Sequence, residues 1–64
     1  MDEEQLQEMR DDAAALATRI ESITEYLEDS PDFDFLSEKH KELMYVQRHT
    51  MKQYLNILLE RLAG

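Results

Sequence analysis

The sequence predicts an all-α protein, an antiparallel two-helix hairpin whose copies assemble into a homo-oligomeric helical bundle. Apolar residues recur every three or four positions in two long segments, and the only proline lies between them. At 64 residues, the chain is near the size at which one core is barely stable without disulfides, metal or self-association. We therefore expect one helical-hairpin domain over residues 1–64, with a helix over about 3–29, a turn over about 30–35 and a helix over about 36–62.

The first helix is predicted by a stripe of apolar residues spaced alternately three and four apart, which is the a/d pattern of a heptad repeat. Its acidic start suits the positive end of a helix dipole. The stripe consists of Leu6, Met9, Ala13, Leu16, Ile20, Ile23 and Leu27.

The segment "EDSPDFDF" predicts the turn. Pro31 lacks the amide that a helix interior needs, and the neighbouring Asp and Ser side chains compete with the helix for hydrogen bonds. We expect the first helix to end near Asp29 and the second to begin between Asp34 and Ser37, either of which can cap it.

The second helix has an apolar arc of roughly 200° when its residues are placed at 100° intervals, which is wider than one partner helix covers. Some of this surface is therefore expected to face another chain. His40 and Gln47 fall inside the arc and are expected to be polar groups that fix the register of the assembly. The predicted oligomer interface is Leu43, Met44, Gln47, Met51, Tyr54, Leu55, Leu58 and Leu62.

The charge distribution excludes several classes of function. The net charge of −8 argues against a DNA or RNA binder. Residues 1–34 hold twelve acidic and two basic residues, whereas residues 35–64 hold three acidic and five basic ones, which favours contact between the two halves or between copies. Charges interrupt every apolar window, there is no cysteine and the N-terminus is acidic, so we expect a cytoplasmic protein without a membrane span.

The sequence offers no expected cofactor, metal site or catalytic centre. His40 and His49 lie on opposite sides of their predicted helix, and the acidic turn lacks the glycine and spacing of a calcium loop. No nucleophile stands beside a base, and no glycine-rich loop is present. We therefore expect a protein that is not an enzyme.

Four basic or histidine side chains share one side of the second helix with an aromatic ring. A ring can stack on a nucleotide base while cations meet its phosphate. The same pattern is also the ordinary charged surface of a helix, pairing with the acidic first helix of a neighbour. The cluster is Lys41, Tyr45, Arg48, His49 and Lys52.

The second helix resembles the C-terminal helix of the phage anti-CBASS sponges, small proteins that bind cyclic oligonucleotides. The resemblance rests on a turn aromatic, Phe35 or Phe33, followed by Leu36, Leu43, Gln47, Met51, Tyr54, Leu58 and Arg61. The first helix matches more loosely through Leu16, Arg19, Ile20 and Leu27.

The resemblance implies a homo-oligomer, apparently a hexamer, that holds cyclic di- and trinucleotide signals between subunits in the infected bacterial host. It places Arg19 and Arg61 at positions of basic residues, Arg19 being the one that meets ligand phosphate. The family also stacks a tyrosine near its N-terminus on a base, whereas this chain has Gln5 or Leu6 there. The predicted ligand-binding set is Arg19, Arg61, Tyr45, Arg48 and Lys52.

Two other interpretations remain. The acidic first helix can act as a protein-interaction module, either an inhibitor or a nucleic-acid mimic that binds a host protein. Alternatively, the chain is a purely structural oligomer. The crowding of Asp2, Glu3, Glu4, Glu8, Asp11 and Asp12 favours the first of these.

Overall fold

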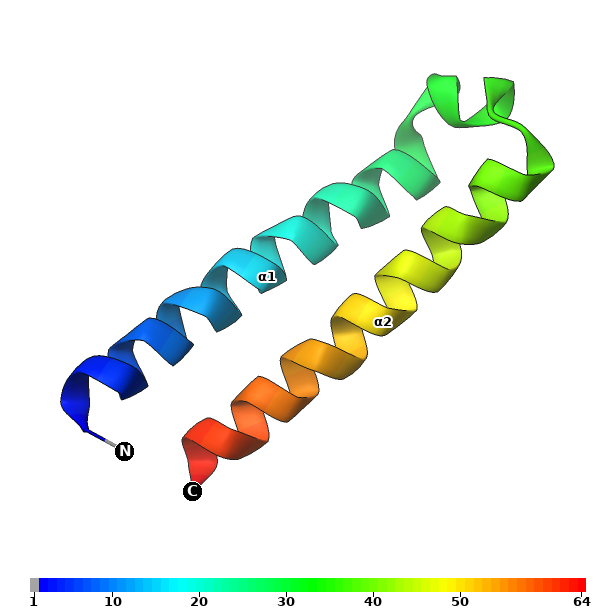
Figure 1. The fold of residues 1–64 in the computed structure, drawn as a ribbon. Helices are drawn as coiled ribbons and strands as arrows, with labels where there is room; N and C mark the ends of the chain where they lie inside the picture. The colour runs from blue at the N-terminus through cyan, green and yellow to red at the C-terminus, as the bar shows by residue number, and fades with distance from the viewer. Residues whose placement is uncertain (1) are drawn as a thin grey trace.

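The computed structural model describes residues 2–64 and contains two long helices joined by a short 3-10 turn. Helix α1 spans Glu3–Asp29, the turn helix η1 spans Pro31–Phe35 and helix α2 spans Glu38–Ala63. Figure 1 shows the helices side by side and antiparallel, with the start of α1 and the end of α2 at the end opposite the turn. The predicted all-α two-helix hairpin is thereby confirmed.

The start of α1 is held by a reciprocal pair of hydrogen bonds. The backbone N–H of Gln5 donates to the Asp2 carboxylate at 2.8 Å, and the backbone N–H of Asp2 donates to the Gln5 side-chain oxygen at 3.3 Å. This capping box satisfies amides that have no partner within the helix. Two glutamates in the first turn, Glu3 and Glu4, also suit the positive end of the helix dipole.

Ser30 and Pro31 mark the end of α1 and the start of the turn. The backbone N–H of Ser30 donates to the carbonyl of Tyr26, and the Ser30 hydroxyl accepts a hydrogen bond from the backbone N–H of Asp32 at 3.3 Å. Pro31 stands at the first turn of η1, where its missing N–H costs nothing.

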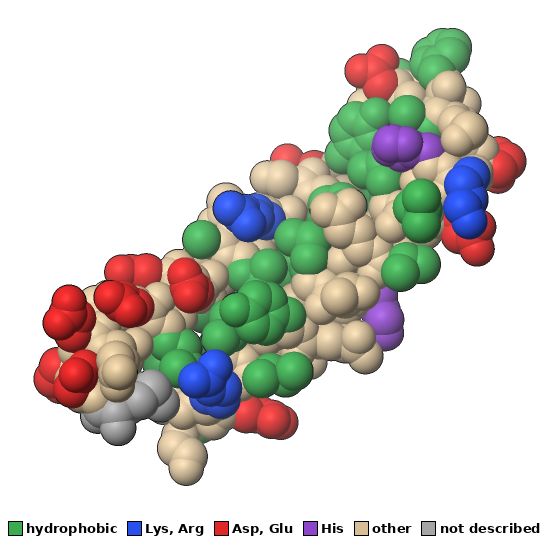
Figure 2. All heavy atoms as spheres, in the orientation of Figure 1, with side chains coloured by type: hydrophobic (Ala, Val, Ile, Leu, Met, Phe, Trp, Pro, Cys, Tyr) green, Lys and Arg blue, Asp and Glu red, His purple; other side chains and the backbone are tan. Residues whose placement is uncertain are grey.

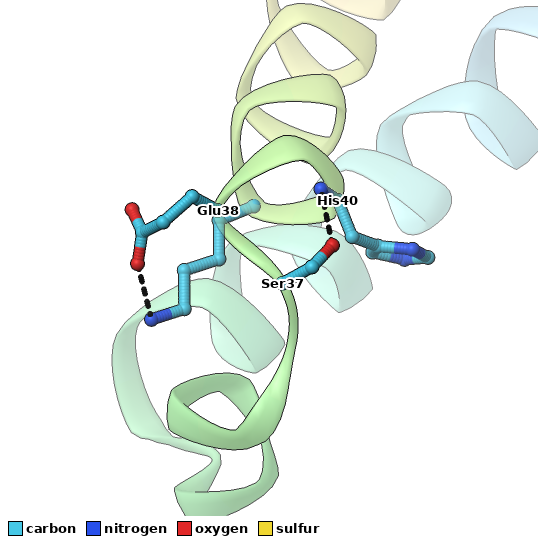
Figure 3. Close-up of polar contacts among 4 residues, drawn as sticks. Ser37, Glu38 and His40 are labelled. Atoms are coloured by element: carbon cyan, nitrogen blue, oxygen red, sulfur yellow. Dashed lines mark hydrogen bonds and ion pairs between the residues drawn. The ribbon is translucent and has the colours of Figure 1, made fainter.

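Helix α2 begins at Glu38, two residues after the predicted start at about residue 36, and Ser37, one of the two predicted caps, is its N-cap. The Ser37 hydroxyl accepts from the backbone N–H of His40 at 3.1 Å. Figure 3 shows this contact, with the Glu38 and His40 side chains on opposite sides of the helix start. Asp34 is not available as the cap because it belongs to η1.

The core is a thin apolar layer between α1 and α2. Leu58 is the most buried residue in it, with 2% of its surface exposed. The apolar stripe of α1 faces α2 as its spacing predicted, and Ile20, Met51, Leu55 and Leu62 pack against the buried cluster. The buried residues are Met9, Ala13, Leu16, Leu27 and Leu58.

Apolar packing, and not charge pairing, holds the helices together. Within residues 2–64, the only ion pair joins Lys41 and Glu38 at 3.4 Å, and both residues belong to α2. An exposed pair of this kind contributes little to stability. The opposite charges of the two halves therefore form no ion pair across the described hairpin.

The single hairpin exposes more surface than a compact monomer of its mass. Its exposed area is 5009 Å², whereas a folded monomer of 7.6 kDa exposes about 4,300 Å² on average. The molecule is elongated, with extents of 47 × 16 × 13 Å. In a rod of only two helices, α1 covers one side of α2, so the broad apolar arc of α2 cannot be buried completely.

Candidate functional site

Two shallow hollows lie on opposite edges of the seam between α1 and α2. One has a volume of about 240 Å³ and contains Arg19, and the other has a volume of about 360 Å³ and contains Lys52. The Arg19 hollow is lined by Asp12, Ala15, Leu16, Arg19 and Tyr54. The Lys52 hollow is lined by Ala17, Ile20, Glu21, Lys52, Leu55 and Asn56.

The Arg19 hollow joins a cation and an aromatic ring from different helices. Arg19 extends from α1, and Tyr54 extends from α2 with half of its surface exposed. The small side chain of Ala15 leaves the space between them open, and the buried Leu16 forms an apolar floor. Arg19 makes no ion pair within residues 2–64, so its guanidinium donors are available to an anion.

Arg61 lies on the same side of α2 as Tyr54. The two residues are seven positions apart, which corresponds to a rotation of about 20° and a rise of about 10 Å along the helix. Arg61 is exposed and also makes no ion pair with any residue from 2 to 64. Figure 2 shows a face on which hydrophobic side chains run between basic ones, while acidic side chains gather at the start of α1.

Each hollow contains one carboxylate as well as one cation. The Lys52 hollow has Glu21 above an apolar floor of Ile20 and Leu55, and the Arg19 hollow has Asp12. In both hollows the opposite charges partly cancel the local field felt by a ligand. The two edges differ because Arg61, on the same side of α2 as Tyr54, adds a second cation near the edge that carries Arg19.

Tyr45 and Arg48 belong to a packed aromatic cluster near the turn. The Phe33 ring meets Tyr26 edge-on at 6.5 Å and Tyr45 edge-on at 6.0 Å between ring centroids. The Arg48 guanidinium lies over the Tyr45 ring at 5.5 Å from its centroid, and the Lys41 Nζ lies over the Phe33 ring at 5.4 Å. These contacts have the geometry of edge-to-face and cation–π interactions, and they tie the turn to both helices.

The five predicted ligand-binding residues therefore divide between two faces of one chain. Arg19 and Arg61 lie along one edge of the seam, whereas Tyr45, Arg48 and Lys52 lie on the other side of α2. One hairpin does not bring all five together. Tyr45 and Arg48 are already engaged with each other and with the turn.

The predicted oligomer interface also divides into two parts. Met51, Leu55, Leu58 and Leu62 pack inside the hairpin against α1, and Met44 is half-buried. Leu43, Gln47 and Tyr54 remain exposed, as does His40, so neither polar residue of the arc is buried in the single chain.

Neither the apolar arc of α2, which contained Tyr54, nor the family resemblance, which supplied Arg19, predicted that the two residues line one hollow, because the alignment of two helices cannot be read from either one alone. The predicted arc also omitted Val46, whose surface is 55% exposed. The position of Val46, three residues after Leu43 and eight before Tyr54, could have placed it on the same side of the helix as these two residues.

The positions proposed for the N-terminal aromatic have structural roles in this chain. Gln5 completes the capping box with Asp2, and Leu6 is half-buried in the apolar stripe. Tyr54 is the aromatic side chain that lines the Arg19 hollow.

No group of three metal-ligating side chains comes together in the part of the chain from residue 2 to residue 64. Over the same described range, neither helix is long and apolar enough to cross a membrane.

The structure is a small, all-helical hairpin with open hollows along the seam between its helices. Among known families, the model described as Sequestin matches residues 3–63. The chain belongs to the Sequestin family, the family of phage anti-CBASS sponges that its sequence resembles. The family name indicates a protein that sequesters signalling molecules. No curated protein and no solved structure shows a significant match.

Proposed function

We propose that this protein is a non-catalytic sponge for cyclic di- or trinucleotide immune signals and antagonises anti-phage defence in the cytoplasm of an infected bacterium. Copies of the hairpin associate into a homo-oligomer, such as a hexamer, and the ligand lies in pockets between subunits. The observation that carries the proposal is the Arg19–Tyr54 hollow on a chain of the Sequestin family.

The chemistry of the hollow suits a nucleotide. Arg19 offers a planar set of N–H donors that match phosphate oxygens, and the exposed face of the Tyr54 ring offers a surface on which a base can stack. Tyr54 thereby supplies the aromatic group that the chain lacks near its N-terminus. Arg61, on the same side of α2, adds a second cation.

A hollow of about 240 Å³ that is open to solvent is only part of a site. Small-molecule pockets usually enclose most of their ligand within about 300–1,000 Å³. A cyclic oligonucleotide also carries two or three phosphates, whereas one chain offers Arg19 and Arg61 together with the opposing carboxylate of Asp12, so a single chain leaves charge uncompensated. Two or three chains that each contribute Arg19 and Arg61 can enclose more of the ligand and balance more of its phosphate charge. This is why binding is proposed between subunits.

Isothermal titration with a panel of cyclic di- and trinucleotides tests the proposal. We expect at least one ligand to bind at a ratio of one per two or three chains, and we expect chromatography to recover it unchanged after incubation. Flat titrations across the panel would remove the sponge proposal, and steady release of a linear nucleotide would replace it with catalysis.

Arg19→Ala tests the role assigned to the hollow. Loss of a charged hydrogen bond costs about 1.5–3 kcal/mol, so we expect Kd to rise roughly 10- to 100-fold while the oligomer mass is unchanged. Arg10→Ala is the matched control, because Arg10 is an exposed arginine of α1 that does not line the hollow. Equal effects of the two variants would show that the hollow is not the ligand site.

The acidic start of α1 favours a second candidate function, an interaction module that binds a basic host protein. Six acidic side chains crowd residues 2–12, and all are exposed without an ion pair within residues 2–64. They are Asp2, Glu3, Glu4, Glu8, Asp11 and Asp12. Recovery of one basic host protein in a pull-down, together with flat nucleotide titrations, would favour this function.

A further inference from the structure

Helix α2 carries a second apolar stripe that α1 does not cover. The stripe consists of Leu43, Val46, Thr50, Tyr54 and Ile57, which are three or four residues apart and fall within about 80° of one another on the helix. All five residues are exposed, and the four apolar ones each expose 50–55% of their surface. This spacing is that of a helix–helix contact surface, and the hairpin leaves about half of each apolar side chain in it uncovered.

The stripe is symmetric about Thr50. Val46 and Tyr54 stand four residues before and after it, and Leu43 and Ile57 stand seven residues before and after it. A two-fold contact requires one patch that is complementary to itself, with residue i of one copy facing residue j of the other and the reverse. A stripe with this symmetry meets that requirement when two α2 helices run antiparallel.

We propose that the stripe docks on the same stripe of a second copy, antiparallel and centred on Thr50. In this arrangement Tyr54 faces the partner's Val46, and Leu43 faces the partner's Ile57. The inference rests on the self-association in the proposed function and adds the surface and the orientation to it.

Side-chain size and helix polarity both favour the antiparallel orientation. A parallel pair in register places Tyr54 against the partner's Tyr54 and Val46 against the partner's Val46, which sets large against large and small against small. The antiparallel pair sets large against small, as close packing requires. It also aligns the helix dipoles head to tail, whereas a parallel pair places like ends together.

The charge pattern is compatible with a copy of this chain as the occupant. Two chains of net charge −8 repel each other, so copies approach best through a surface without acidic groups. Residues 43, 46, 50, 54 and 57 include none, and Gln47 and Gln53 beside them are neutral. The carboxylates of α2 that flank the stripe, Glu42 and Glu60, lie about 40° outside it. The symmetric apolar segment ends at Lys39 and Arg61, eleven residues on either side of Thr50. These like charges restrict the contact to the segment between them.

The exposed area is consistent with one such contact. The hairpin exposes 5009 Å², which is about 700 Å² more than an average monomer of this mass. Each partner in a standard protein interface contributes about 800 Å². The excess is therefore of the size that one partner chain covers.

Disulfide trapping tests the contact, because the chain contains no cysteine of its own. In the antiparallel pair, residue 43 lies opposite the partner's residue 57, whereas the two copies of residue 43 are about 21 Å apart along the helix. A disulfide requires Cα atoms within about 7 Å. We therefore expect a mixture of Leu43→Cys and Ile57→Cys chains to cross-link on oxidation, and each variant alone to remain uncross-linked.

Thr50→Cys and His49→Cys complete the experiment. Thr50 lies on the proposed axis, so Thr50→Cys is expected to cross-link by itself. The exposed His49 lies roughly 100° away from it on the helix, so His49→Cys is the control that is expected to stay uncross-linked. Circular dichroism shows whether each variant folds before it is oxidised.

Self-cross-linking of Leu43→Cys would overturn the orientation, and absence of cross-links at every stripe position in folded variants would overturn the interface. Both readouts are made without nucleotide, so they separate this inference from the sponge. Ligand binding by a protein that gives no cross-links at the stripe would overturn only the interface. Cross-links together with flat titrations would overturn only the sponge.

Discussion

Two adjacent leucines of α2 have very different surroundings. Leu58 is 2% exposed and lies in the core cluster, whereas Leu59 is 50% exposed. A rotation of 100° per residue moves the second side chain off the face that meets α1. Because only five of residues 2–64 are buried, we infer that the stability of the hairpin depends heavily on Leu58.

We expect Leu58→Ala to lower the free energy of unfolding by about 2–5 kcal/mol, because it removes buried methyl groups and leaves a cavity. Leu59→Ala is the same substitution at an exposed position and is expected to change the free energy of unfolding by at most about 0.5 kcal/mol. Urea titrations at one protein concentration, followed by circular dichroism, compare the two. Equal midpoints would contradict the assignment of Leu58 to the core.

At the scale of elements, local signals explain where each helix begins. The capping box of Asp2 and Gln5 starts α1, Ser30 lies between α1 and the turn that begins at Pro31, and Ser37 starts α2. Each signal acts between residues at most three positions apart. Such contacts form as soon as the local backbone does, so they can be read from the sequence.

We expect Ser37→Ala to destabilise the protein by about 1 kcal/mol, because the backbone N–H of His40 loses its acceptor. Ser22→Ala makes the same chemical change at an exposed position inside α1, where alanine has the higher helix propensity, so a small stabilisation is expected. Thermal unfolding of both variants measures the difference. A stabilising Ser37→Ala would show that Ser37 does not cap α2.

At the scale of the whole molecule, association and ligand binding are expected to respond to salt in opposite directions. Added salt screens the repulsion between chains of net charge −8 and therefore favours the oligomer. It also screens the attraction between Arg19 or Arg61 and phosphate, and therefore weakens binding of a cyclic nucleotide.

Sedimentation and titration at about 20 mM and about 500 mM salt measure both effects, since the Debye length falls from tens of ångströms to a few over that range. We expect a larger assembled fraction at high salt and a higher Kd for the ligand. An oligomer that dissociates as salt rises would indicate that contacts between acidic and basic faces join the copies, in place of the apolar stripe of α2.

Much of the candidate site could be predicted from the sequence, but its arrangement could not. Arg19 was named and lines one hollow with Tyr54, and Arg61 was named and lies on the same side of α2 as Tyr54. Tyr45, Arg48 and Lys52 were grouped with them and lie on the other side of α2. This division could not be read from the sequence because the wheel of one helix does not show where its partner lies.

The sequence by itself determined the two helices, the turn between them, the stripe of α1 that faces inward and the family of the protein. The helices, the turn and the stripe follow from periodicity and capping, which act over a few residues, whereas the family follows from the likeness of the sequence to its members. Only the tertiary structure decided which part of the broad apolar arc of α2 is covered and that Tyr54 stands beside Arg19. Both depend on how side chains about forty positions apart pack together, and an arc wider than one helix is compatible with several such packings.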